Sequence, residues 1–310
     1  MMDRRKFIKK SVNFSVAAFG LLNFKVPVIF SMANNQPKLS TDFDLIKVEN
    51  SVPGSMVQKA VELLGGISKF VKKGDTVVIK PNIAWARRPE QAANTNPQVI
   101  AEIVRLCRKA GAYRIKVFDN TCNEAKQCYH LSGIEKAAKK EGADVTYIYK
   151  QKFKKIKIPR GKILKSWEFY SDALTADVFI NVPIAKQHSL AKVTMSLKNT
   201  MGIIGGNRGQ IHNNFDQKLA DLNTIIKPQL IILDATRILL RNGPQGGNLN
   251  DVKAANTIIA GVDPVAVDSL GATLFGLESK ELGYIQQSYN LGLGEMDLKK
   301  LKIETVNLAG

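Results

Sequence analysis

Short apolar runs alternate with amphipathic stretches along most of this chain of 310 residues. Runs rich in β-branched residues predict strands at 76–80, 114–118, 144–149, 176–182, 229–234 and 255–261. Apolar residues at helical spacing predict helices at 97–109, 132–141 and 264–275, with Asn96 as the N-cap of the first. Because strands that alternate with helices form parallel sheets, we expect an α/β fold: a mostly parallel sheet with helices on both faces.

A strongly basic segment at 150–165 interrupts this alternation. It holds eight Lys and Arg residues with apolar residues between them, and Pro-Arg-Gly-Lys at 159–162 supplies a turn. The pattern predicts a small basic β-hairpin inserted at an edge of the sheet, where lysines discourage edge-to-edge aggregation. Contact with an anionic membrane surface or another polyanion is the alternative interpretation.

Polar residues follow five of the predicted strands at the point where each strand ends. They are Lys80 and Asn82, Asp119, the segment from Asn181 to His188, Asp234, and Asp263. In open parallel sheets, ligands bind in the crevice beyond the carboxyl ends of the strands. We therefore expect these residues to share one site, together with the polar segment at 194–202.

Lysine and histidine side chains define the chemistry that we expect at this site. Three lysines can supply charge and hydrogen-bond donors to an anionic ligand, and crowding lowers the pKa of neighbouring ammonium groups. Four residues are predicted to be catalytic: Lys186, His188, Lys198 and His212. Seven residues are predicted to bind the ligand or orient the catalytic groups: Lys80, Asn82, Asp119, Asn199, Asp234, Asp263 and Asp268.

A divalent metal is an alternative use of the two histidines. His188 and His212, with Asp216, Asp234 or Asp268, would suit a site of two histidines and one carboxylate. Their spacing matches no zinc motif, and the nearby lysines would repel a cation. The sequence therefore identifies no particular metal.

Glycine-bearing loops at 202–209 and 243–247 accompany these residues. Such loops are either plain turns or backbone that presents N–H groups to an anion. Neither loop matches a nucleotide P-loop, and no dinucleotide fingerprint follows the first strand.

Several of these motifs form a set that is spread over nearly the whole of residues 34–310. The set comprises 78–82, 94–97, 177–183, Lys186, His188, 194–202, His212, Asp234, Gly243-Pro244, Gly246, 263–268 and 292–294. In these motifs the chain resembles the family catalogued as Domain of Unknown Function 362. The resemblance implies a single α/β unit with a polar site built from those segments, and it implies no particular reaction.

Members of that family often carry or adjoin ferredoxin-like iron–sulfur modules, which implies a link to redox chemistry. This chain departs from that pattern, because it has no Cys-x-x-Cys-x-x-Cys run. We therefore expect no intrinsic iron–sulfur cluster, and any cluster would belong to an iron–sulfur partner protein.

The first 33 residues have the pattern of an export signal. Arg4 and Arg5 precede Phe7, an uncharged run covers 11–24, and small residues stand at 31–33. This pattern is typical of the twin-arginine route, so we expect the twin-arginine translocase as a partner and a periplasmic or otherwise exported location. Cleavage would leave one domain at 34–310, and an uncleaved signal would act as an anchor.

The charge balance and the cysteines restrict the partners further. Lys and Arg number 45 against 27 Asp and Glu, and this excess favours anionic partners such as a small molecule or lipid headgroups. Export argues against nucleic acid. Cys122 and Cys128 could close one disulfide in an oxidising compartment, and free thiols are the other outcome.

Two functions of different classes are consistent with these observations. The first is an exported enzyme or cofactor-binding protein that acts on an anionic small molecule, with a link to redox chemistry. The second is a periplasmic protein that binds an anionic ligand without catalysis. The sequence does not identify the substrate, the reaction or the oligomeric state.

Overall fold

The computed structural model describes residues 42–309, and the export signal predicted at 1–33 lies outside this range. One sheet of ten strands forms the centre of this part of the chain. The strands are β1 (Leu45–Glu49), β2 (Thr76–Pro81), β3 (Arg114–Val117), β4 (Asp144–Val145), β7 (Val178–Val182), β8 (Ile184–His188), β9 (Lys192–Thr194), β10 (Leu230–Leu239), β11 (Val252–Gly261) and β12 (Ile303–Asn307).

Parallel pairing dominates this sheet. The strand order is β12-β1-β11-β10-β7-β2-β3-β4, and β8 pairs with β10 and with β9 beside this path. The neighbours from β10 to β4 all run parallel, whereas β11 runs antiparallel to both β10 and β1. The predicted α/β class with a mostly parallel sheet is therefore confirmed.

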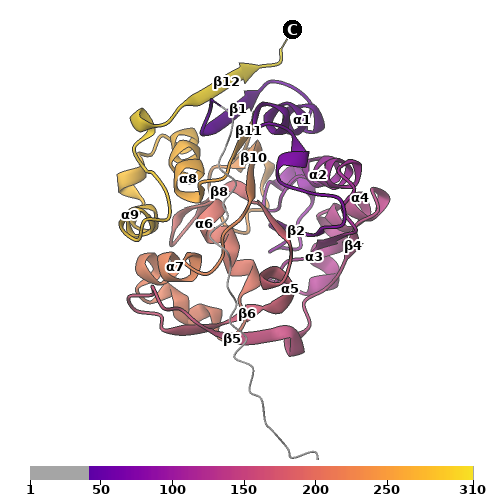
Figure 1. The fold of residues 1–310 in the computed structure, drawn as a ribbon. Coiled ribbons are helices and arrows are strands. Elements are labelled where there is room, and N and C mark those ends of the chain that lie inside the picture. Colours follow the sequence, from indigo (N-terminus) through magenta and orange to yellow (C-terminus); the bar gives the residue numbers. More distant parts are fainter. Residues whose placement is uncertain (1–41, 310) are drawn as a thin grey trace, which may run out of the picture. The chain divides into compact units, whose positions relative to one another are not determined.

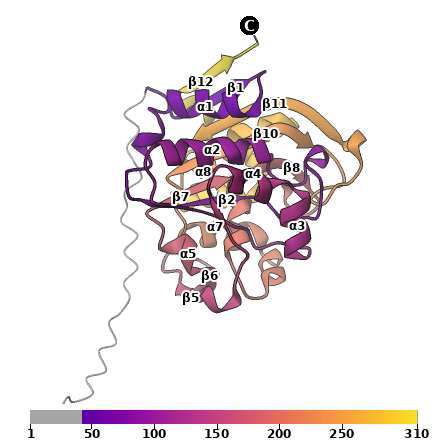
Figure 2. The same ribbon diagram turned by 90° about the vertical axis from the view of Figure 1, so that its right-hand side faces the viewer.

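Helices cover both faces of the sheet (Figure 1). Their bounds are α1 (Pro53–Leu63), α2 (Pro97–Lys109), α3 (Ala125–Leu131), α4 (Ile134–Lys140), α5 (Ser171–Leu174), α6 (Ser196–Asn199), α7 (Phe215–Asn223), α8 (Pro264–Ala272) and α9 (Gly283–Asn290). Helices α1, α2 and α4 pack together on one face, and α6, α7, α8 and α9 lie on the other (Figure 2). None of the helices between residues 42 and 309 has the length and apolar character needed to cross a membrane.

Helix α2 shows how local sequence sets an element of this fold. The Asn96 side chain accepts a hydrogen bond from the backbone N–H of Gln98 at 3.0 Å, and Pro97 occupies the first turn, as predicted. The apolar positions of the helix, among them Ile100 and Ile103, are fully buried against the sheet. The cap and the apolar face together hold α2 beside the carboxyl ends of the strands.

The direction of β11 corrects one prediction about the site. Because β11 is antiparallel to β10, its last residue, Gly261, pairs with Ile231 near the start of β10. Asp263 therefore lies at the amino ends of the parallel strands, away from Lys80 and Asn82 at the carboxyl end of β2. The apolar pattern of 255–261 predicts a strand but does not distinguish the two directions.

The basic segment forms a hairpin, although not at an edge of the main sheet. Strands β5 (Phe153–Lys157) and β6 (Ser166–Tyr170) pair with each other in a separate two-stranded sheet. Gly205 donates its backbone N–H to the Glu168 carbonyl oxygen at 2.9 Å, and the Trp167 indole donates to the Gly205 carbonyl oxygen at 3.1 Å. These bonds attach the hairpin to the loop that follows α6.

Candidate functional site

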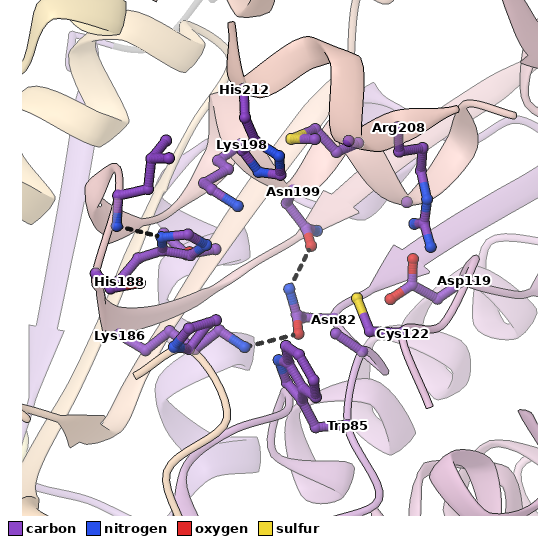
Figure 3. A pocket seen from close by; sticks show the side chains of 18 of the residues that line it. Asn82, Trp85, Asp119, Cys122, Lys186, His188, Lys198, Asn199, Arg208 and His212 are labelled. Atoms are coloured by element: carbon purple, nitrogen blue, oxygen red, sulfur yellow. Dashed lines mark hydrogen bonds between the residues drawn. The ribbon is translucent and has the colours of Figure 1, made fainter. Parts of the chain in front are cut away.

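A cavity of about 550 Å³ opens beside the carboxyl ends of β2 and β3. Side chains from β2, β8, α6 and the loops around them line it (Figure 3). Eight of the predicted site residues are among them: Lys80, Asn82, Asp119, Lys186, His188, Lys198, Asn199 and His212. The structure therefore brings together the polar groups that follow the predicted strands at 76–80, 114–118 and 176–182. It adds to them the polar groups of α6.

Lys80 and Asp119 form a buried ion pair in the wall of this cavity. The Lys80 ammonium lies 2.8 Å from one Asp119 carboxylate oxygen, and the other oxygen accepts a hydrogen bond from the Ile83 backbone N–H at 2.6 Å. Burial lowers the pKa of Lys80, and the Asp119 charge partly offsets this effect. Gly202 makes room for the pair, because a Cβ atom there would collide with both charged groups.

Two asparagines connect this ion pair to a second lysine. The Asn199 side-chain oxygen accepts hydrogen bonds from Lys80 Nζ at 2.8 Å and from Asn82 Nδ2 at 3.1 Å. Lys186 Nζ donates to the Asn82 side-chain oxygen at 3.2 Å and to the Ala93 carbonyl oxygen at 2.6 Å. The network fixes the position of the Lys186 ammonium without giving it a negatively charged partner.

Lys186 and Lys198 are cations without a carboxylate counterion in the described part of the chain. Burial, together with the positive charge of Lys198, lowers the pKa of Lys186 to about 7. Burial also lowers the pKa of Lys198 to about 8, and its ammonium lies 5.9 Å from the centre of the Phe215 ring. Both ammonium groups are therefore close to losing their protons at neutral pH.

His188 is held as a neutral imidazole. Its Nδ1 accepts hydrogen bonds from the backbone N–H groups of Leu190 at 3.1 Å and Ala191 at 3.2 Å, so the proton of the neutral ring is on Nε2. Burial and the nearby charge of Lys198 lower the pKa of His188 to about 3. The ring can therefore donate a hydrogen bond from Nε2 in the cavity that it lines, and it does not act as a base through Nδ1.

His212 lines the same cavity but is exposed to solvent. Its ring stacks on Phe215 with 6.0 Å between the ring centres. Partial burial and the charge of Lys198 lower the pKa of His212. This histidine therefore lies near Lys198, in a more open position than His188.

The further lining residues that the sequence analysis does not assign to the site include Trp85, Cys122 and Arg208. The Arg208 guanidinium donates to the carbonyl oxygens of Asn120 at 2.7 Å and Thr121 at 2.8 Å, which ties the 202–209 loop to the segment after β3. Figure 3 shows Arg208 and Asp119 across the cavity from Lys186 and His188. The signal for Arg208 was present, because it lies in a glycine-bearing loop that was considered for anion binding.

The cysteines remain free thiols, so the alternative of a disulfide between Cys122 and Cys128 is not realised. Cys122 is exposed in the cavity, whereas Cys107 and Cys128 are buried. Burial raises the pKa of Cys107 to about 12 and that of Cys128 to about 11. Cys122 is thus the accessible thiol of the three.

Three predicted carboxylates lie outside the cavity lining, and each accepts hydrogen bonds from backbone N–H groups. Asp234 accepts from Asn96 at 2.7 Å, at the start of α2. Asp263 caps α8. Asp268 accepts from Ser196 at 2.6 Å and Leu197 at 3.0 Å, at the start of the short helix that carries Lys198 and Asn199. Asp268 thus supports the helix that carries two site residues, whereas Asp234 holds the start of α2, and burial raises the pKa of both.

The geometry does not support the metal alternative. Between residues 42 and 309, no group of three or more His, Cys, Asp or Glu side chains is arranged to hold a metal ion. The carboxylates considered for such a site do not line the cavity, whereas His188 and His212 do. The donors in the cavity are mainly ammonium groups, which suit an anion.

Comparisons with known proteins agree with the family resemblance. The model of a family described as "Domain of unknown function (DUF362)" matches residues 77–273, which include all eight predicted residues in the cavity. A thylakoid-associated protein of Synechocystis sp. is 26% identical over 266 residues, covering 80% of this chain and 79% of that protein.

Two solved structures are similar at lower identity. The lactate racemase apoprotein of Thermoanaerobacterium thermosaccharolyticum is 14% identical with a TM-score of 0.39, and the match covers 63% of this chain and 50% of that one. A protein of Thermotoga maritima is 10% identical with a TM-score of 0.43, covering 72% of this chain and 58% of that one. The chain thus spans about half the length of the first of these proteins and somewhat more than half that of the second.

Proposed function

We propose a function on the premise that this chain belongs to the family described as "Domain of unknown function (DUF362)". In this proposal the cavity binds a small organic anion and exchanges a proton with it. The observation that carries this proposal is the charge imbalance of the cavity. Its lining contains four cationic side chains, Lys80, Lys186, Lys198 and Arg208, and one carboxylate, Asp119. Since Asp119 is already paired with Lys80, a bound anion would supply the missing negative charge.

Lys186 and His188 have the properties needed for proton transfer. A group with a pKa near 7 is populated in both protonation states at neutral pH, which suits a general acid or base. A neutral imidazole can donate a hydrogen bond to a carbonyl or carboxylate oxygen without giving up its proton. In this proposal Lys186 exchanges the proton and His188 Nε2 orients the oxygen of the anion.

Alkylation of Cys122 gives a direct test of binding in the folded protein. Iodoacetamide should modify Cys122 alone, because the other two thiols are buried and have raised pKa values. We expect acetate or inorganic phosphate to slow this reaction several-fold in a saturable manner, measured by mass spectrometry. Methylammonium chloride at equal ionic strength should give no protection.

A Cys122→Ser variant provides the control for this test, since it should incorporate no label while folded. Denatured wild-type protein should react at all three thiols. If neither anion protects Cys122 at concentrations up to tens of millimolar, the proposed function is wrong.

Export by the twin-arginine route is the second part of the proposal, and the sequence supports it through Arg4 and Arg5. A receptor that reads both arginines should not accept lysines in their place. We therefore expect the variant Arg4→Lys/Arg5→Lys to accumulate in the cytoplasm, while the wild-type chain reaches the periplasm or its membrane. Immunoblots of cell fractions measure this, and an unchanged distribution would exclude the twin-arginine route.

A further inference from the structure

A second cavity, of about 530 Å³, adjoins the first and is not used by the proposed function. The basic hairpin forms part of its wall through Phe153 and Glu168, and the loop after α6 contributes Gly205 and Gly206. A Cβ atom on Gly205 would lie 2.8 Å from the Phe153 ring, so glycine permits this close contact between loop and hairpin. The hairpin is therefore part of a hollow beside the candidate site.

The two cavities meet at the same two side chains. Asp119 and Arg208 line both of them. The two hydrogen bonds from Arg208 to the carbonyl oxygens of Asn120 and Thr121 hold its guanidinium at this boundary. A molecule that occupies both cavities would therefore contact these two side chains.

The charges of the second cavity differ from those of the first. Its ionisable lining residues are two cations, Lys150 and Arg208, and two carboxylates, Asp119 and Glu168. Asp119 is paired with Lys80, and neither Lys150 nor Glu168 has an ion-pair partner in the part of the chain at 42–309. The first cavity is thus strongly cationic, whereas the second is balanced in charge.

Apolar side chains contribute to the second cavity as well. Ala125, Ile148 and the Phe153 ring line it beside the polar groups. Such a mixture of apolar surface and balanced charge favours a ligand group that is polar in part but has no net charge. An additional anionic group would gain little there, because Glu168 opposes Lys150.

We infer that the ligand is an elongated organic anion: its anionic head lies in the first cavity, and a net-uncharged, partly apolar extension lies in the second. This inference rests on the proposed function, since it assumes an anion in the first cavity. It assigns to the basic hairpin a role in ligand specificity.

Paired ligands test the inference on the full chain. Acetate has only the anionic head, whereas hippurate joins a carboxylate to an amide and an aromatic ring. We expect hippurate to bind at least tenfold more tightly than acetate, by calorimetry or by protection of Cys122. The variant Ala125→Trp, at the first position of α3, should fill the second cavity and bring the ratio of the two affinities close to one.

Lys126→Trp is the matched control, because Lys126 is the next residue of the same helix, is exposed and lines neither cavity. It should keep the wild-type preference for hippurate. Acetate binding without a preference for hippurate, or a preference that survives in Ala125→Trp, would overturn this inference and leave the proposed function standing. Failure of both ligands to bind wild-type protein would overturn both.

Discussion

Replacement of Asp119 by asparagine is expected to lower the free energy of unfolding by about 3–5 kcal/mol, because it leaves the buried Lys80 ammonium without its counterion. Asparagine keeps an oxygen that can accept the hydrogen bond from Ile83. The loss of stability therefore arises mainly from the missing negative charge. Lys80 is 1% exposed, which excludes water as a substitute partner. Urea denaturation at pH 7, monitored by circular dichroism, measures the change.

Two further variants make this prediction specific. Lys80→Met combined with Asp119→Asn removes both charges, so we expect it to recover most of the stability lost in the single variant. Asp144→Asn breaks the exposed ion pair with Arg114 and should cost less than about 1 kcal/mol, because water screens that pair. A double variant as unstable as Asp119→Asn would show that the ion pair is not the cause.

Much of this fold could be predicted from local sequence patterns. The apolar runs that became β2, β7 and β10 stand out because strands buried on both faces need nearly continuous apolar residues. The cap of α2 was readable for a similar reason, since the Asn96 side chain bonds within its own turn. Patterns that arise from such local requirements are visible in a single sequence.

Features that depend on distant partners were not predicted. Strands β1 and β12 pair with each other although more than 250 residues separate them, and their short runs carry no comparable signal. The antiparallel direction of β11 likewise depends on its neighbours β10 and β1. Asp263 was consequently assigned to an end of the sheet at which it does not lie.

The candidate site was predicted better for its cations than for its carboxylates. Every lysine and histidine predicted for the site lines the cavity, even where, as for Lys80 and His188, it also bonds to other parts of the fold. Carboxylates such as Asp234 and Asp268 have a second use, since they accept hydrogen bonds from backbone N–H groups. The sequence pattern alone does not separate these two uses, whereas the geometry does.

Replacement of Lys186 by methionine is expected to weaken the binding of acetate about tenfold to a hundredfold. The reason is that the variant removes a charged hydrogen-bond donor, worth about 1.5–3 kcal/mol, and methionine fills similar space. Folding should be preserved, since Lys186 has no charged partner that would be left unpaired. Calorimetric titration measures the affinity, and Lys136→Met, an exposed lysine on α4, is the matched control that should bind as wild type does.

The pH dependence of acetate binding distinguishes a specific contribution of the Lys186 ammonium from a general effect of positive charge. The protonated ammonium holds the anion and is present below its pKa, which is about 7 for Lys186 and about 8 for Lys198. Wild-type affinity for acetate should therefore be highest below pH 7 and fall as the pH rises towards 9. In Lys186→Met the fall should begin about one pH unit higher, because Lys198 then governs it alone. An identical pH profile in both proteins would show that Lys186 does not bind the anion.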